Sequence, residues 1–273
     1  KRVFDNCLDD PLEGSRVTPQ DESQPPAAPD LRVSLDRDIL RGTLALEVFW
    51  QALREDWRIV RHGPGAFAGA PATVETILAE GPMPRIETLP FDDQVLDRLR
   101  AARAAGRRVI LTSIGARGFA ESVADHLGCI DAVETVTEAH RISPMIRTGP
   151  AAGLSRAYTI LRAMRPHQWV KTVLVFLPMI ADHGLTPANI GWTLLAFVAF
   201  ALVASAVYVL NDLIDLPADR RHPIKRHRPF ASGALPLAVG TWMFPGLLAA
   251  GLGLAAVGGP NLLAVMVLYA VTT

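Results

Sequence analysis

The segment VLNDLIDLPADRRHPIKRHRPF, residues 209–230, gathers side chains that can bind a metal ion and phosphate. Its carboxylates Asp212, Asp215 and Asp219 are spaced three and four residues apart. At about 100° per residue, this spacing predicts that all three lie on one face of a helix. Three like charges repel one another unless a cation is shared, and Mg²⁺ takes one or two carboxylates together with phosphate oxygens. The segment therefore predicts a seat for a Mg²⁺-bound diphosphate.

A run of cations follows the aspartates, and its members can neutralise the remaining phosphate charge. They are Arg220, Arg221, Lys225, Arg226 and Arg228. Prolines on both sides of HPIKRHRP predict a loop that folds over the site. A topology signal or a contact with lipid headgroups explains the cations equally well. His222 and His227 lack a third ligand, and we expect them to be exposed loop residues.

The second half of the sequence has the composition of membrane helices. Residues 192–210 carry no charge and match the roughly 20 residues needed to cross the hydrocarbon core. No charged residue occurs from 230 to 273, which predicts two helices broken at GGPN, residues 258–261. The apolar segment 169–181 is shorter. A buried helical core of a soluble protein is the alternative. We expect an integral membrane protein surrounded by lipid.

Basic residues predict the orientation of these helices. RPHQWVK (165–171) precedes the first apolar segment, the cation run follows the second, and ADHGLTPANIG (181–191) between them has neither Lys nor Arg. The positive-inside rule therefore predicts that the first half and the charged loop lie on the cytoplasmic side of the inner membrane. The formal net charge of +0 indicates no nucleic-acid partner.

The first half predicts an α/β domain. Residues 1–30 are polar and proline-rich, and we expect them to be disordered. Over residues 31–145, LRVSL and VILTS predict strands, while FDDQVLDRLRAARAAG and FAESVADHLG predict helices capped by Asp92 or Asp93 and ended by Gly106 and Gly128. This order implies a parallel sheet. Residues 146–164 form a predicted linker, and 165–273 the membrane domain. The 2 cysteines fit neither a disulfide framework nor a zinc site.

The charged segment resembles a known family. NDLIDLPADRRHPIKRHRP is similar to the first aspartate-rich motif, N-D-x-x-D-x-x-x-D, of the UbiA superfamily of intramembrane prenyltransferases. Its tail and RPHQWVKTVLVFLP (165–178) resemble the decaprenyl-phosphate phosphoribosyltransferase branch. The resemblance implies an α-helical transmembrane bundle with a cavity open to the cytoplasm. The residues that it implies for metal and donor are Asn211, Asp212, Asp215 and Asp219, with Gln168, Lys171, Lys225 and Arg228 on phosphate.

The resemblance also implies a reaction. A polyprenyl phosphate attacks the anomeric carbon of phosphoribosyl diphosphate, and Asp212, Asp215 and Lys171 are the predicted catalytic residues. The first alternative is transfer of a polyprenyl group from its diphosphate to an aromatic acceptor. The second is a non-catalytic, membrane-tethered binding module or an inactive fragment. Pro217 predicts a helix end or kink before Asp219. The family's second aspartate-rich motif does not occur by residue 273, so we expect about half of an active site.

The first half resembles the haloacid-dehalogenase-like phosphatases. VSLDRDILRG (33–42) and RRVILTSIGAR (107–117) are similar to their first two motifs. In the favoured alignment Ser34 replaces the nucleophilic aspartate and Asp38 the threonine; in the other, Asp36 is the nucleophile and Asp38 the acid. Ser113 supplies the second-motif hydroxyl. The third motif's lysine and the fourth motif's G-D-x-x-x-D are missing, so we predict a degenerate Rossmann-like domain serving as a cytoplasmic lid or docking module.

Overall fold

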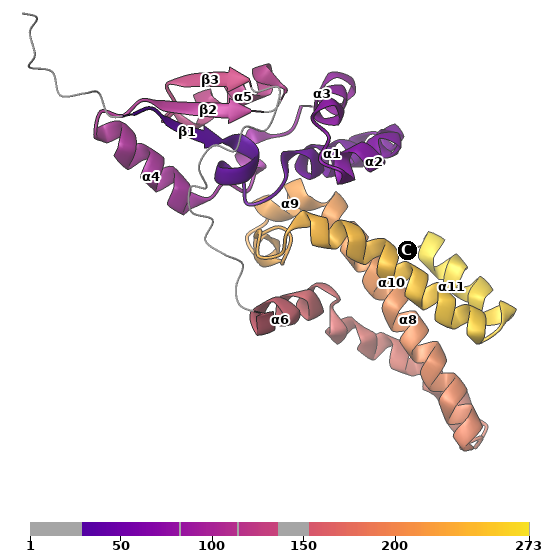
Figure 1. The fold of residues 1–273 in the computed structure, drawn as a ribbon. Helices are drawn as coiled ribbons and strands as arrows, with labels where there is room; N and C mark the ends of the chain where they lie inside the picture. The colour runs from indigo at the N-terminus through magenta and orange to yellow at the C-terminus, as the bar shows by residue number, and fades with distance from the viewer. Residues whose placement is uncertain (1–28, 82, 114, 136–152, 273) are drawn as a thin grey trace, which may run out of the picture.

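The computed structural model describes residues 29–81, 83–113, 115–135 and 153–272. The chain is mostly helical and carries one small sheet (Figure 1). In the first half the strands are β1 (Leu31–Ser34), β2 (Val109–Ser113) and β3 (Ala132–Thr135), and the helices are α1 (Leu44–Glu55), α2 (Gly63–Phe67), α3 (Pro71–Glu80), α4 (Asp93–Ala104) and α5 (Arg117–Leu127). Short helical turns are η1 (Leu35–Ile39), η2 (Trp57–His62) and η3 (Ile86–Thr88).

The second half contains only helical elements among its described residues. These are α6 (Gly153–Ala163), η4 (Pro166–Phe176), α7 (Leu177–Ala181), α8 (Pro187–Ile214), α9 (Leu216–Arg221), η5 (Lys225–His227), α10 (Leu237–Val257) and α11 (Pro260–Thr272). Helix α6 occupies part of the predicted linker. The predicted disordered segment lies almost wholly outside the described residues, as do residues 136–152.

The predicted parallel sheet is confirmed. Its strand order is β1-β2-β3, and β2 pairs in parallel with both neighbours. Helix α5 packs on β2 and β3, and α4 packs on β2. The capping predictions also hold: the Asp92 side chain accepts a hydrogen bond from the Gln94 N–H at the start of α4, and Gly128 ends α5 with a φ of 63°.

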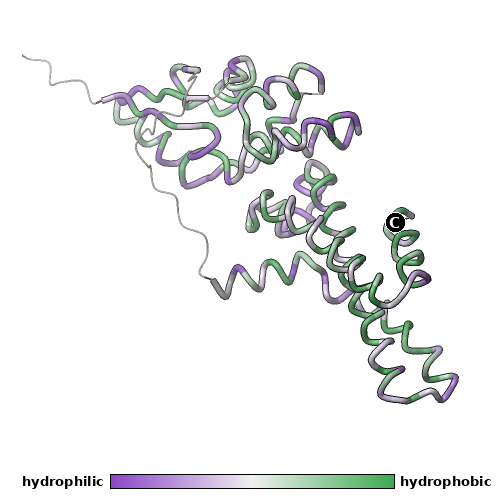
Figure 2. Tube along the Cα trace, turned by 45° about the vertical axis from the view of Figure 1, so that its right-hand side comes forward, coloured by the Kyte–Doolittle hydropathy of each residue, from purple (hydrophilic) through white to green (hydrophobic). Residues whose placement is uncertain are grey.

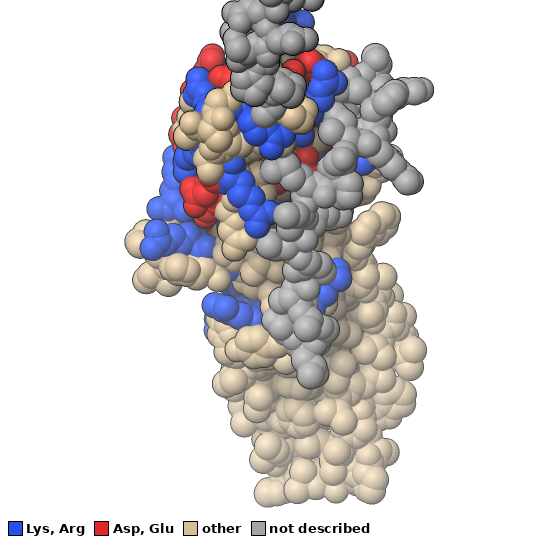
Figure 3. All heavy atoms as spheres, turned by 60° about the vertical axis from the view of Figure 1, so that its left-hand side comes forward, with Lys and Arg blue, Asp and Glu red and all other residues tan. Residues whose placement is uncertain are grey.

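Two helices are long and apolar enough to cross a membrane, namely α8 and α10, and α11 is a shorter apolar helix. The predicted break at residues 258–261 separates α10 from α11. Figure 2 shows these helices as a continuous hydrophobic arm, whereas the first half is mixed. In Figure 3 the Lys, Arg, Asp and Glu atoms gather over one half of the visible face, and the far end of the arm has none.

The two halves share one core. Buried side chains of the first half, such as Leu44 and Phe49, belong to the same cluster as Leu213, Leu216 and Phe230 of the second half. Helix α1 is buried at every position from Leu44 to Ala52, as expected of a helix with neighbours on all sides. The first half is therefore packed against the end of α8 rather than tethered to it.

Candidate functional site

The aspartate-rich segment spans a helix break. Helix α8 ends at Ile214, Asp215 is its C-cap, and α9 begins at Leu216 with Pro217 near its first turn. The predicted effect of Pro217 is thus confirmed: the helix ends before Asp219. Because the spacing rule holds only within one continuous helix, the three carboxylates do not share a face.

Two of the three aspartates meet in a buried cluster. Asp212 is 3% exposed and Asp219 is 1% exposed, and Nη1 of Arg228 donates to both, at 3.2 Å from Asp212 Oδ1 and 2.5 Å from Asp219 Oδ2. Arg165 donates to Asp212 Oδ1 as well. Lys225 Nζ lies 3.9 Å from Asp219 Oδ1. We call these five residues the carboxylate cluster.

Asp215 lies outside the carboxylate cluster. Its side chain is 47% exposed, and its Oδ1 is 3.5 Å from Nη1 of Arg54 on α1. The prediction that all three carboxylates line one face is therefore wrong for Asp215, because the helix has ended at that residue. The metal role predicted for it stays a prediction.

The remaining predicted site residues, Asn211, Gln168 and Lys171, are not members of the carboxylate cluster. Asn211 and Lys171 are exposed. The Tyr208 hydroxyl lies 3.5 Å from Gln168 Oε1, which ties η4 to α8. Trp169 strengthens that tie by donating from Nε1 to Ser205 Oγ at 3.1 Å. The phosphate contacts predicted for Gln168 and Lys171 stay predictions.

Arg165 is a site residue that sequence reasoning missed. It belongs to the segment RPHQWVK, in which sequence reasoning assigned site roles to Gln168 and Lys171 but none to Arg165. Its φ is 54°, a left-handed conformation that is uncommon outside glycine. Its guanidinium carbon lies 4.9 Å from the centre of the Tyr208 ring. Residues in this conformation cluster at functional sites, and the guanidinium of Arg165 donates to Asp212.

The donor set of the carboxylate cluster fits a divalent cation. Asp219 Oδ1 is buried and has no hydrogen-bond donor among the described residues, because its contact with Lys225 is too long. Mg²⁺ commonly uses one or two carboxylates and completes its shell with water and phosphate. Within the described ranges no group of three or more His, Cys, Asp or Glu residues is placed to hold an ion. The fit is therefore to a two-carboxylate site formed by Asp212 and Asp219.

The first half places its motif residues at one edge of the sheet. Ser34 ends β1 and Ser113 ends β2, so both lie at the carboxyl edge. Asp38 Oδ2 accepts from the Ser34 N–H at 2.8 Å, and Asp36 Oδ1 accepts from the Leu44 N–H at 3.1 Å. These hydrogen bonds do not distinguish the two alignments, so the placement of Ser34 at the nucleophile position stays a prediction. A serine hydroxyl at that position is not an anionic nucleophile, and the neighbouring carboxylates of Asp36 and Asp38 are already engaged by backbone N–H groups.

Burial sets the ionisation of Asp36. Loss of hydration raises the pKa of this carboxyl above its ordinary value, and this outweighs the hydrogen bond from Leu44 and the charge of Arg37, which act in the opposite direction. The ionised form of Asp36 is therefore less favoured in the folded chain than it is in water.

An ion pair joins the first half to the aspartate-rich segment. Arg220, which follows Asp219, donates from Nη1 and Nη2 to the two carboxylate oxygens of Glu47 on α1 at 2.8 and 2.9 Å. Arg220 Nη1 also donates to the Thr88 carbonyl. Trp50 Nε1 donates to Thr241 Oγ1 on α10 at 3.0 Å. Residues 47, 50, 51 and 54 recur at the spacing of one helical face, so α1 presents a polar docking face to the membrane half.

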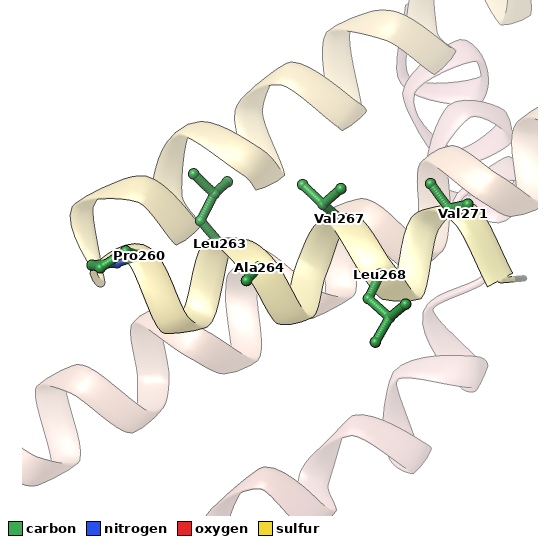
Figure 4. Close-up of a pocket in the computed structure, with 6 residues that line it drawn as sticks. All are labelled: Pro260, Leu263, Ala264, Val267, Leu268 and Val271. Carbon is green, nitrogen blue, oxygen red and sulfur yellow. The ribbon is translucent and has the colours of Figure 1, made fainter.

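A shallow apolar groove of about 530 Å³ runs along α11. Figure 4 shows Leu263, Val267 and Val271 pointing to the same side of the helix. The groove is lined by Pro260, Leu263, Ala264, Val267, Leu268 and Val271. It offers no group that could do chemistry.

The fold and site together define a chain in which an α/β domain is docked on the charged end of membrane-length helices. The sequence model of the haloacid dehalogenase-like hydrolases matches residues 28–183, more than half of the chain, and the chain belongs to this family. The model of the UbiA prenyltransferase family matches residues 170–273, which form a UbiA-family domain. Both family resemblances predicted from the motifs are thereby confirmed.

Curated relatives match different shares of this chain. The uncharacterized protein y4nM of Sinorhizobium fredii is 28% identical over 72% of this chain and 48% of its own length. Nodulation protein NoeC of Azorhizobium caulinodans is 46% identical over 41% and 36%, respectively. A decaprenyl-phosphate phosphoribosyltransferase of Mycobacterium tuberculosis is 41% identical over 47% and 43%. The chain thus spans less than half the length of these relatives. No solved structure gives a significant match.

Proposed function

We propose that this chain belongs to a membrane transferase that moves a phosphoribosyl group from phosphoribosyl diphosphate to a polyprenyl phosphate. The observation that carries the proposal is the carboxylate cluster: two buried aspartates and three cations at the charged end of an apolar helix. Similarity to proteins named decaprenyl-phosphate phosphoribosyltransferase supports this reaction over other UbiA chemistry.

In this proposal Asp212 and Asp219 hold Mg²⁺. The ion, when bound, supplies positive charge for the diphosphate that leaves. Asp219 Oδ1 can accept a cation without losing a hydrogen bond, because it has no hydrogen-bond donor among the described residues, and Lys225 Nζ lies 3.9 Å away. Asp215 receives no metal contact in this arrangement, because Arg54 holds it.

The cations of the cluster have a second task. With Asp212 and Asp219 holding the ion, Arg165, Arg228 and Lys225 would bind phosphate oxygens, and the arginines would do so with paired donors. The lipid phosphate oxygen then forms a bond to the anomeric carbon while the bond from that carbon to diphosphate breaks. The protein's contribution is preorganised positive charge around the leaving group.

The haloacid-dehalogenase-like domain serves as a docking module without phosphatase activity. Ser34 replaces the nucleophilic carboxylate, and no lysine lies between Lys1 and Lys171 to supply the third motif. An aspartyl-phosphate mechanism needs a carboxylate nucleophile, and it also needs a general acid, a cation and a metal ion beside that carboxylate. The shared core and the Glu47–Arg220 pair support a structural role for the domain beside the charged end of the membrane helices.

The reaction is tested on the full-length protein in membrane vesicles with phosphoribosyl diphosphate and a polyprenyl phosphate, with and without Mg²⁺. Asp212→Asn combined with Asp219→Asn is expected to lower the rate by at least roughly a hundredfold, the scale of removing one preorganised electrostatic group. Asp182→Asn is the matched control, because Asp182 is exposed beyond the other end of α8. Full activity in the double variant would refute the metal role.

Substrate competition separates this reaction from prenyl transfer. If the protein transfers a phosphoribosyl group, phosphoribosyl diphosphate is expected to raise its unfolding temperature, because the ligand binds the folded state preferentially. Protection by a polyprenyl diphosphate alone would instead indicate transfer to an aromatic acceptor.

A further inference from the structure

A second polar pocket lies between the two halves, apart from the carboxylate cluster. Its volume is about 220 Å³, which suits a small polar group better than a whole nucleotide. Helix α1, the loop before η3 and helix α9 all contribute to its wall. The lining residues are Gln51, Arg54, Glu55, Met83, Pro84, Arg85, Pro217 and Arg221.

Positive charge dominates the lining. Three guanidinium groups, from Arg54, Arg85 and Arg221, face a single carboxylate of the lining, Glu55. Among the described residues, Arg221 makes one hydrogen bond with its side chain, from Nε to the Pro217 carbonyl at 3.1 Å. The Arg85 side chain has no hydrogen bond or ion pair with any residue that the structure describes. Several guanidinium donors are therefore available to an incoming anion.

A buried and unpaired polar group lines the same pocket. Gln51 is 7% exposed, and its Nε2 amide has no hydrogen-bond acceptor among the described residues. A buried donor without an acceptor costs roughly 1–3 kcal/mol. An oxyanion in the pocket would supply the missing acceptor once the amide turns toward it.

We propose that the pocket between α1 and α9 binds a phosphate group through Arg54, Arg85, Arg221 and Gln51. A phosphate dianion offers oxygens in several directions, which matches guanidinium groups arriving from three separate elements, whereas a carboxylate offers two oxygens in one plane. The group comes either from a free phosphate or from the headgroup of a lipid. The pocket does not depend on the transferase reaction.

Arg54 connects this pocket to the aspartate-rich segment. Its guanidinium already contacts Asp215 Oδ1 at 3.5 Å, and both side chains are about half exposed or less. A phosphate in the pocket competes with Asp215 for that cation. Removing the competitor by Asp215→Asn is therefore expected to tighten phosphate binding.

The test uses the full chain in neutral phosphatidylcholine nanodiscs at constant ionic strength, with inorganic phosphate titrated against chloride. Phosphate is expected to raise the unfolding temperature saturably. Arg85→Gln is expected to weaken the apparent affinity about tenfold or more, the scale of one charge-assisted hydrogen bond. Because Arg85 is exposed, the variant is expected to fold. Arg98→Gln, on the exposed face of α4, is the matched control.

Three further arms decide the inference. Nanodiscs containing phosphatidic acid show that the phosphate group comes from a lipid headgroup if they raise the unfolding temperature of the parent but not of Arg85→Gln, while free phosphate raises neither. Binding that persists in Asp212→Asn separates this pocket from the carboxylate cluster, so failure of the transferase proposal leaves it intact. The inference is overturned if neither phosphate source stabilises the chain, if Arg85→Gln and Arg98→Gln behave alike, or if Asp215→Asn weakens binding.

Discussion

Replacing Glu47 by alanine tests whether the two halves form one folding unit. Glu47 is 1% exposed, and its partner Arg220 is 8% exposed. In the Glu47→Ala variant Arg220 keeps its bonds to the Thr88 and Ala231 carbonyls but loses its counter-charge. The variant therefore leaves a buried guanidinium without a carboxylate.

The expected magnitude follows from that burial. Breaking a buried ion pair by removing one partner typically costs about 3–5 kcal/mol, because the remaining charge is uncompensated. For a chain of this size each kcal/mol lowers the unfolding temperature by roughly 2–4 °C. Glu47→Ala is therefore expected to lower it by roughly 6–20 °C.

Thermal unfolding in detergent micelles, followed by tryptophan fluorescence, measures this shift. Trp50 is a suitable probe because it lies one turn after Glu47 and donates to Thr241 across the junction. Glu121→Ala is the control: it breaks the exposed Arg117–Glu121 pair, a kind that contributes at most about 1 kcal/mol. Equal shifts in the two variants would refute the reasoning.

Two further predictions concern helix contact and ionisation. Gly251→Ala is expected to destabilise the α8–α10 contact, because the added Cβ would lie 2.7 Å from Val203 Cγ2. Gly253→Ala on the same helix is the control: its Cβ meets nothing within 4 Å, so it should be neutral or stabilising. Unfolding temperatures of the two variants are compared. Asp36→Asn is expected to be more stable than the parent at pH 7 and to lose that advantage below pH 4. Burial raises the pKa of Asp36, so the folded chain holds its proton to higher pH than the unfolded chain, and stability falls as pH rises through that range. Unfolding temperatures measured between about pH 3 and about pH 8 check this. The 74% exposed Asp97→Asn is the control, and an Asp36→Asn variant less stable than the parent at pH 7 would contradict the prediction.

Local rules predicted much of the fold from the sequence. The strands at LRVSL and VILTS, the Asp92 cap, the Gly128 stop and the break at residues 258–261 each depend on a few neighbouring residues. Helix α1 was not predicted as a docking element. Its polar face, with Glu47, would ordinarily be assigned to solvent, and only Arg220, far away in the sequence, explains why that carboxylate is buried.

The carboxylate cluster shows how a helix break changes a spacing argument. The spacing of the aspartates grouped Asp215 with Asp212 on one helical face. Pro217 predicted a helix end or kink, which placed Asp219 in doubt. The structure reverses the two: the turn after Ile214 leaves Asp215 facing Arg54 of the first domain, while α9 returns Asp219 to Asp212 under the single Nη1 of Arg228. A spacing rule describes one rigid helix, so it cannot place residues on the two sides of its end. Arg228, in the loop after η5, and not the helical period decides which carboxylates meet, because it donates to both Asp212 and Asp219. Asp215 is left to pair with Arg54 of the docked domain, which holds it apart from the other two aspartates.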